Sequence, residues 1–206
     1  MAIVALPVDL LVSQHSFGVR RYDITFPGGD TGAVQTAVHG FPRRMCSLTS
    51  PPLISDEDAA RWRTLLHALD GRVNHLAVHD RLNPEPRGTA RGAWTASAAG
   101  AGSAVMTINA GAAQAGKTLL AGDWIGVNQM SSGRQMLHVQ ADTTVDGNGW
   151  MLVSFKPVLR IAVAAGSVVV WQRPTCLMKS QSDEDSWSVS KGKQGGFSLD
   201  LLEQWF

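Results

Sequence analysis

Apolar and polar residues alternate over most of the chain, and this alternation predicts short β-strands. The stretch VRRYDITF (residues 19–26) is one example, because Tyr22, Ile24 and Phe26 fall on one face of an extended backbone. Further strands are predicted over residues 32–41, 43–50, 72–80, 104–110, 119–127, 136–140, 150–155 and 168–172. The pattern is therefore that of a mainly β protein.

One segment departs from this pattern and has the period of an amphipathic helix. In ISDEDAARWRTLLHALDG (residues 54–71), Ser55 is placed to cap the N-terminus, three acidic residues follow it, and Gly71 is placed to end the helix. Apolar residues recur at helical spacing, and they are Ala59, Trp62, Leu65, Leu66 and Leu69. The sequence predicts one amphipathic α-helix that covers a core made of strands.

The composition changes in the middle of the chain. Residues 81–101 are rich in Pro, Gly and Ala, which predicts a linker or a long crossover. VDGNGW (residues 145–150) predicts a hairpin, because Asp-Gly and Asn-Gly accept the positive φ angles of tight turns. We therefore predict a split fold, in which residues 1–84 and 174–206 form a β-rich core domain with the helix. Residues 88–173 form an inserted small β-barrel or β-sandwich module.

The segment GAAQAGKTL (residues 111–119) matches the phosphate-loop pattern G-x-x-x-x-G-K-[ST]. A working loop lies between a buried strand and a helix, since the helix N-terminus supplies part of the anion site. A strand is predicted before the segment, but Gly122 and Asp123 form a turn only four residues after Thr118. The segment is therefore interpreted as a glycine-rich hairpin between two strands, and no nucleotide or other cofactor is predicted.

The charge balance narrows the range of partners. The 206 residues include 18 basic and 17 acidic side chains, a formal net charge of +1, so nothing favours nucleic acid as a partner. Only 17% of the residues are charged, while seven are tryptophan, which is typical of proteins that cover part of their surface with partners. The apolar N-terminus is too short to span a bilayer, so no membrane insertion is predicted. Cys46 and Cys176 lack metal-binding spacing and are expected to be buried free thiols.

Other groups of chemically active residues have simple structural interpretations, and no catalytic or metal site is predicted. His75 and His79 are four residues apart, but in a strand, where they are expected to face solvent. Asp142, Asp146 and Asn148 lack the calcium-loop sequence and are interpreted as a hairpin tip. No nucleophile motif links the residues that could be recruited into a triad, which are Ser47, Ser50, His39 and Asp56.

Aromatic residues are the best candidates for binding. A small barrel buries only one or two tryptophan rings, so exposed ones can stack on sugar rings or fill a pocket of a neighbouring protein. Core packing is the competing interpretation, both for these residues and for the aromatic C-terminus. The candidate interface or glycan contacts are Trp94, Trp124, Trp150, Trp205 and Phe206, and Trp171 lies in the same inserted module.

Four stretches of the chain resemble the distal tail or tail-tip proteins of long-tailed bacteriophages and prophages. They are LAVHDRLNPEPRG (76–88), AGKTLLAGDWIGV (115–127), LHVQADTTVDGNGWMLVSFKPVLRIAVAAGSVVVWQRP (137–174) and GFSLDLLEQW (196–205). The likeness covers roughly half to two-thirds of the chain and consists of spaced turns and aromatic residues. It contains no catalytic motif, so an enzyme is not expected.

The resemblance implies a structural protein of the virion tail that is assembled in the host cytoplasm. Similar distal tail proteins form a homo-oligomeric six-fold ring between the tail tube protein and the tail-tip hub proteins of the baseplate. Their β-rich core carries a peripheral β domain, which in relatives is a carbohydrate-binding fold, an OB-like barrel or a spacer. The alternative function is a carbohydrate-binding module that recognises a host surface glycan through exposed tryptophans of the insert.

Overall fold

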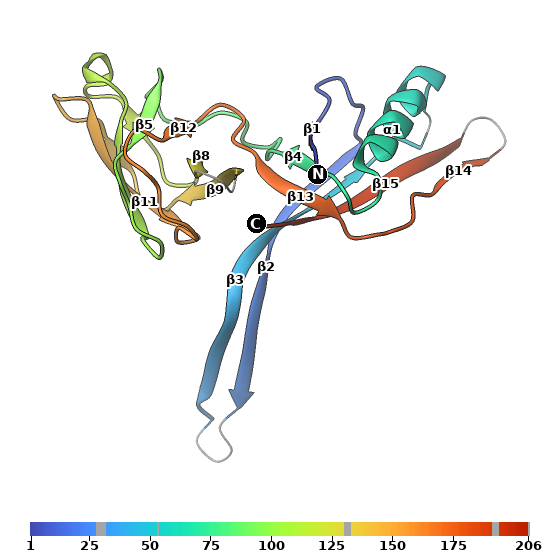
Figure 1. The fold of residues 1–206 in the computed structure, drawn as a ribbon, viewed down its shortest axis with the longest axis horizontal. Coiled ribbons are helices and arrows are strands. Elements are labelled where there is room, and N and C mark those ends of the chain that lie inside the picture. Colours follow the sequence, from blue (N-terminus) through green and yellow to red (C-terminus); the bar gives the residue numbers. More distant parts are fainter. Residues whose placement is uncertain (28–31, 53, 130–132, 191–193, 206) are drawn as a thin grey trace. The chain divides into compact units, whose positions relative to one another are not determined.

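The computed structural model describes residues 1–27, 32–52, 54–129, 133–190 and 194–205. These residues fold into two compact units (Figure 1). The first unit combines the two ends of the chain, residues 1–76 and 178–204, and the second consists of residues 77–177 with Trp205. Strands dominate both units, and the described residues contain one α-helix, which confirms the predicted fold class.

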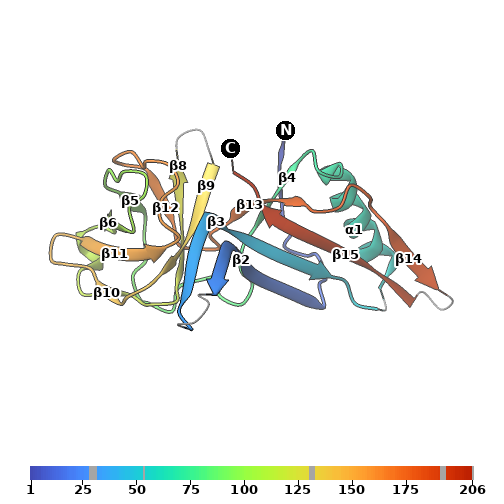
Figure 2. The ribbon, with the colours of Figure 1, turned by 90° about the horizontal axis from the view of Figure 1, so that it is seen from below.

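The first unit contains a sheet of seven strands (Figure 2). Six of them follow the order β1-β4-β13-β15-β3-β2, and β14 pairs with β15 off this path. β1 and β2 are therefore the outer strands of the path. The strands are β1 (Ile3–Ala5), β2 (Gln14–Pro27), β3 (Val34–Thr49), β4 (His75–Val78), β13 (Cys176–Ser180), β14 (Trp187–Ser190) and β15 (Gln194–Glu203).

The apolar C-terminal segment forms an inner strand of this sheet. β15 pairs with β13 on one side and with β3 on the other, where Leu199 lies opposite Leu48 and Leu201 opposite Cys46. All four of these side chains are buried. Backbone hydrogen bonds and a shared core therefore hold the two ends of the chain together.

Helix α1 (Asp56–Leu69) begins and ends close to the predicted positions. The Oγ of Ser55 accepts a hydrogen bond from the backbone N–H of Asp58, and Gly71 beyond the helix has a φ of 59°. α1 packs on the sheet through Trp62, whose ring stacks on that of Phe197 in β15 with centroids 5.7 Å apart. The other buried residues of the helix are Leu65, Leu66 and Leu69. The predicted apolar face is thus the face that meets the core.

β2 and β3, of 14 and 16 residues, pair with each other along their whole lengths. β15 pairs with β3 only over Met45–Thr49, so the remainder continues as a two-stranded ribbon, residues 19–27 and 34–44, which we call the arm (Figure 1). The register shifts on either side of Tyr22, where β-bulges absorb the two extra residues of β3. The arm is therefore an extension of the sheet that β15 does not accompany.

The second unit contains a closed barrel with the strand order β11-β6-β5-β12-β8-β9. The pair β7–β10 and the short 3-10 turn η1 belong to its connections. The elements are β5 (Trp94–Ala96), β6 (Val105–Asn109), η1 (Ala112–Gln114), β7 (Thr118–Leu119), β8 (Trp124–Gln129), β9 (Gly133–Val139), β10 (Thr143–Thr144), β11 (Trp150–Lys156) and β12 (Val168–Val170). Of the two architectures predicted for the inserted module, the structure has the barrel.

The stretch 81–101, predicted as a linker or crossover, is instead part of the barrel. It contains β5, and Trp94 lies in the buried core. Asp123, whose side chain is 2% exposed, accepts hydrogen bonds from the backbone N–H groups of Arg87 and Gly88. The prediction was wrong because a carboxylate distant in sequence, rather than local side chains, fixes this stretch.

The turn predicted at residues 145–150 is present, but it does not join a hairpin. The N–H of Gly149 donates to the Asp146 carbonyl, and the N–H of Asp146 donates to the Trp150 carbonyl. The strands on either side pair elsewhere, β10 with β7 and β11 with β6. The hairpin prediction is wrong because the strand before the turn has only two residues, which pair with Thr118–Leu119.

Candidate functional site

The segment with the phosphate-loop sequence uses its backbone amides within the fold. Five consecutive N–H groups, those of residues 114–118, donate to protein acceptors. The acceptors are the carbonyl oxygens of Gly111, Ala112, Gln114 and Val145 and the hydroxyl of Thr89. A phosphate site needs such amides aimed at the anion. β6 pairs with β5 and β11, and β7 pairs with β10, so the strands before and after the segment do not pair with each other. The prediction of a hairpin is therefore wrong, and the segment is a connection between two sheets.

His75 and His79 are not the solvent-facing pair that the alternation predicted. His75 is buried, because β4 is an inner strand of the sheet, and His79 is half-buried. Burial, with the positive charges of Lys179 and the N-terminal amine, lowers the pKa of His75 below its usual value. Among the described residues, no group of three or more His, Cys, Asp or Glu side chains is arranged to hold a metal ion.

The residues considered for a triad are separated or engaged elsewhere. β3 separates His39 from Ser47 by eight residues, about 26 Å along an extended strand. The Ser50 hydroxyl accepts a hydrogen bond from the N–H of Phe197 and so joins the end of β3 to β15.

Asp146, which was considered for a calcium loop, accepts hydrogen bonds from two backbone N–H groups of its own turn, which is the role expected of a turn residue.

Two of the candidate tryptophans are buried in the second unit. Trp94 is a fully buried core residue, and its Nε1 donates to the Arg91 carbonyl. Trp124 is 8% exposed, its Nε1 donates to Asp80 at 3.1 Å, and its ring meets His138 edge-on. Both rings therefore stabilise the barrel rather than present a surface to a partner.

Trp150 is the exposed tryptophan of the barrel, with 38% of its surface accessible. It begins β11, and cross-strand pairing places it beside Asn109 of β6, which lies beside Thr95 of β5. All three side chains are at least partly exposed. An aromatic ring, an amide and a hydroxyl thus form one row across three strands on the outer face of the barrel.

The C-terminal aromatic residues lie in different circumstances. Trp205 is half-buried, and the guanidinium of Arg160 lies over its ring, with the central carbon 4.0 Å from the ring centroid. Phe206 lies outside the described residues. Trp205 is therefore already engaged within the second unit.

The arm exposes apolar side chains on both of its faces. Ile24 and Phe26 of β2 are 50% and 53% exposed, and they share a face with Tyr22 and Arg20 because every second residue of a strand points the same way. Val38 is 75% exposed and lies on the other face. Two-stranded ribbons are marginally stable in water, and their unpaired edges readily bind other chains. The arm is therefore a candidate assembly surface.

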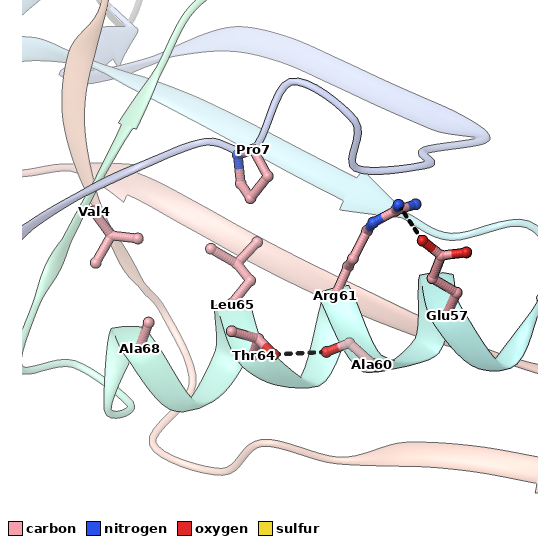
Figure 3. A pocket seen from close by; sticks show the side chains of 8 residues that line it. All are labelled: Val4, Pro7, Glu57, Ala60, Arg61, Thr64, Leu65 and Ala68. Carbon is pink, nitrogen blue, oxygen red and sulfur yellow. Dashed lines mark hydrogen bonds and ion pairs between the residues drawn. The ribbon is translucent and has the colours of Figure 1, made fainter.

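The other edge of the sheet carries a hollow of about 440 Å³. It lies between the N-terminal segment around β1 and helix α1, and Figure 3 shows Val4, Pro7, Leu65 and Ala68 gathered about it. Further apolar residues of the N-terminal segment are exposed, and they are Ile3, Val8 and Leu11. The first unit thus has a second apolar surface, at the outer strand opposite the arm.

A group of charged residues borders this hollow. The guanidinium of Arg61 contacts the carboxylates of Asp9, Glu57 and Asp58 at 3.0, 2.6 and 2.9 Å. The side chains of Asp9 and Glu57 are mostly exposed. We call these four residues the acidic cluster, because three carboxylates share one guanidinium and leave an excess of negative charge.

No protein-family model matches the sequence, and no curated protein matches it. Within the described ranges, no helix has both the length and the apolar character needed to cross a membrane. The function must therefore be inferred from these surfaces and from the resemblance in sequence.

Proposed function

We propose that this chain is a structural protein of a phage tail. It forms a ring at the distal end of the tail tube and connects the tube to the tail-tip and receptor-binding apparatus. The observation that carries the proposal is a single sheet with apolar surface at both outer strands, the arm at β2 and the hollow beside β1. A head-to-tail contact requires two different surfaces on each copy, and such contacts close into a ring when the rotation between neighbours allows it.

The resemblance to distal tail proteins supports the remaining details of the proposal. It indicates six copies in the ring, with the tail tube protein and the tail-tip hub proteins as neighbours, in a virion assembled in the host cytoplasm. The barrel of the second unit is consistent with the peripheral β domain of those proteins. The proposed role is geometric, and it assigns no catalysis or cofactor to the chain.

The purified chain is expected to form closed rings at micromolar concentration, because ring closure covers both apolar surfaces of every copy. Size-exclusion chromatography with light scattering measures the number of chains in the particle, and negative-stain imaging shows whether the particle is closed. Images of the assembled tail show whether the chain also forms a ring there. A chain that is monomeric in solution and builds no ring in the tail would refute the proposal.

A second candidate function is carbohydrate binding by the barrel. The row Thr95–Asn109–Trp150 favours it, because the exposed ring offers a stacking surface for the apolar face of a sugar. The amide and the hydroxyl beside it can bond to the sugar hydroxyls. The candidate site is therefore the outer face of β5, β6 and β11, and Trp94 and Trp124 have no part in it.

Trp150→Ala is expected to abolish glycan binding, because the mutation removes the stacking surface while the residue makes no contribution to the barrel core. Binding to an array of bacterial surface glycans measures the effect. Trp187→Ala is the matched control, since Trp187 is 41% exposed and lies in the first unit. An array without signal for the unchanged protein, or equal binding by both variants, would argue against this function.

A further inference from the structure

We infer that the arm of one copy docks on the hollow between β1 and α1 of the next copy, an inference that rests on the ring proposed above. Both surfaces belong to the first unit and lie at the two outer strands of one sheet. The arm therefore does not fold back on the hollow of its own chain. In a ring built this way, every copy presents its arm to one neighbour and its hollow to the other.

The surface of the arm that docks is the face of β2 formed by Arg20, Tyr22, Ile24 and Phe26. Ile24 and Phe26 are about half exposed, and the guanidinium of Arg20 lies 5.8 Å from the centroid of the Tyr22 ring. The six residue steps from Arg20 to Phe26 span about 20 Å of extended strand. This docking face is thus cationic at one end and apolar at the other.

The receiving surface has the same two parts at a similar spacing. Its apolar part is the hollow, where Val4, Leu65 and Ala68 meet (Figure 3). Its charged part is the acidic cluster at the N-terminal end of α1. The eleven residue steps from Glu57 to Ala68 span about 17 Å of helix.

Charge and length together determine the direction in which the docking face lies along α1. When the docking face is laid along α1, Phe26 reaches the hollow and Arg20 reaches the exposed carboxylates of the acidic cluster. The reverse direction would place the Arg20 guanidinium on apolar side chains and leave the excess carboxylate charge without a counterion. A second copy of this chain is therefore the occupant of the hollow, with its arm in one orientation.

Two variants with complementary defects test the contact. Phe26→Asp places a carboxylate in the docking face, and Ala68→Arg fills the hollow with a long cationic side chain. Each variant alone is expected to stay monomeric at concentrations where the parent forms rings. In an equimolar mixture the two are expected to form dimers containing one chain of each and nothing larger, because only one intact arm and one intact hollow remain to pair.

The control is Val38→Asp, which places the same charge on the opposite face of the arm and is expected to form rings like the parent. Light scattering counts the chains in each sample, and circular dichroism verifies that each variant is folded. Rings from Phe26→Asp or from Ala68→Arg alone, or a mixture that yields no dimers, would overturn the docking while the ring of the parent stands.

A pair of introduced cysteines tests the contact between the arm and the hollow without relying on ring formation. The double variant Phe26→Cys with Ala68→Cys is expected to give a ladder of disulfide-linked dimers, trimers and larger species on oxidation. Cys46 and Cys176 are buried and do not compete. Each single cysteine variant is expected to give at most dimers. A double variant that also stops at dimers overturns the docking, whereas a parent without rings counts against the proposed function.

Discussion

Replacement of Trp62 by alanine is expected to lower the free energy of unfolding by about 3–5 kcal/mol. The indole is fully buried, lies 11° from parallel with the ring of Phe197 in β15, and donates from Nε1 to the Leu11 carbonyl at 3.0 Å. Alanine would leave a cavity between α1 and the sheet and would remove that hydrogen bond. Urea denaturation of the full chain, followed by circular dichroism, measures the change.

Trp187 provides the matched control for this prediction. Its ring also lies against Phe197, with centroids 6.0 Å apart, but 41% of its surface is exposed. Trp187→Ala is therefore expected to change the free energy of unfolding by about 1 kcal/mol or less. Equal losses of unfolding free energy in the two variants would show that the burial of Trp62 between α1 and the sheet does not stabilise the fold.

The helix could be predicted closely because its signals are local. Ser55 caps a helix that starts one residue later, and the apolar residues at helical spacing are those that the sheet buries. A cap depends on side chains and amides within three residues of each other, so the sequence alone contains the necessary information. The same holds for the turn around Asp146, where the side chain bonds to amides of its own turn.

Strand pairing could not be predicted in the same way, because it depends on residues that are far apart in sequence. The strand β10 precedes a strong turn signal, yet it pairs with Thr118–Leu119 rather than with the strand beyond the turn. Residues 81–101 have the composition of a linker, but the carboxylate of Asp123 binds their backbone and fixes them to the barrel. The composition of a stretch indicates how flexible it would be by itself, but it does not indicate which distant residue binds and orders it.

The candidate binding residues show the same limit of sequence reasoning. Counting tryptophans indicated that some would be exposed, but the contacts with Asp80 and His138 that cover Trp124 involve other strands and loops. The alternation around Ile24 is typical of a half-buried strand. Ile24 is exposed because the pairing of β15 with β3 ends at Met45. The residues of β2 contain no signal from which this end could be predicted.

The backbone at Gly149 lies so close to another segment of the chain that only glycine fits there. Its φ of 89° is unfavourable for any residue with a side chain, and a Cβ would lie 2.3 Å from the carbonyl carbon of Gly111 and 2.4 Å from the nitrogen of Ala112. Both are backbone atoms, so no side chain can rotate away to make room. The N–H of Ala110 donates to the Gly149 carbonyl at 2.8 Å and holds the two segments together.

Gly149→Ala is therefore expected to lower the free energy of unfolding by about 2–5 kcal/mol, from left-handed strain of about 1–2 kcal/mol and overpacking of about 1–3 kcal/mol. Urea denaturation of the full chain measures it. Gly147→Ala is the matched control, since a Cβ at Gly147 would meet no atom within 4 Å, and its effect is expected to stay within about 0.5 kcal/mol. If Gly149→Ala were as stable as Gly147→Ala, the close packing of Gly149 on the backbone of Gly111 and Ala112 would be refuted.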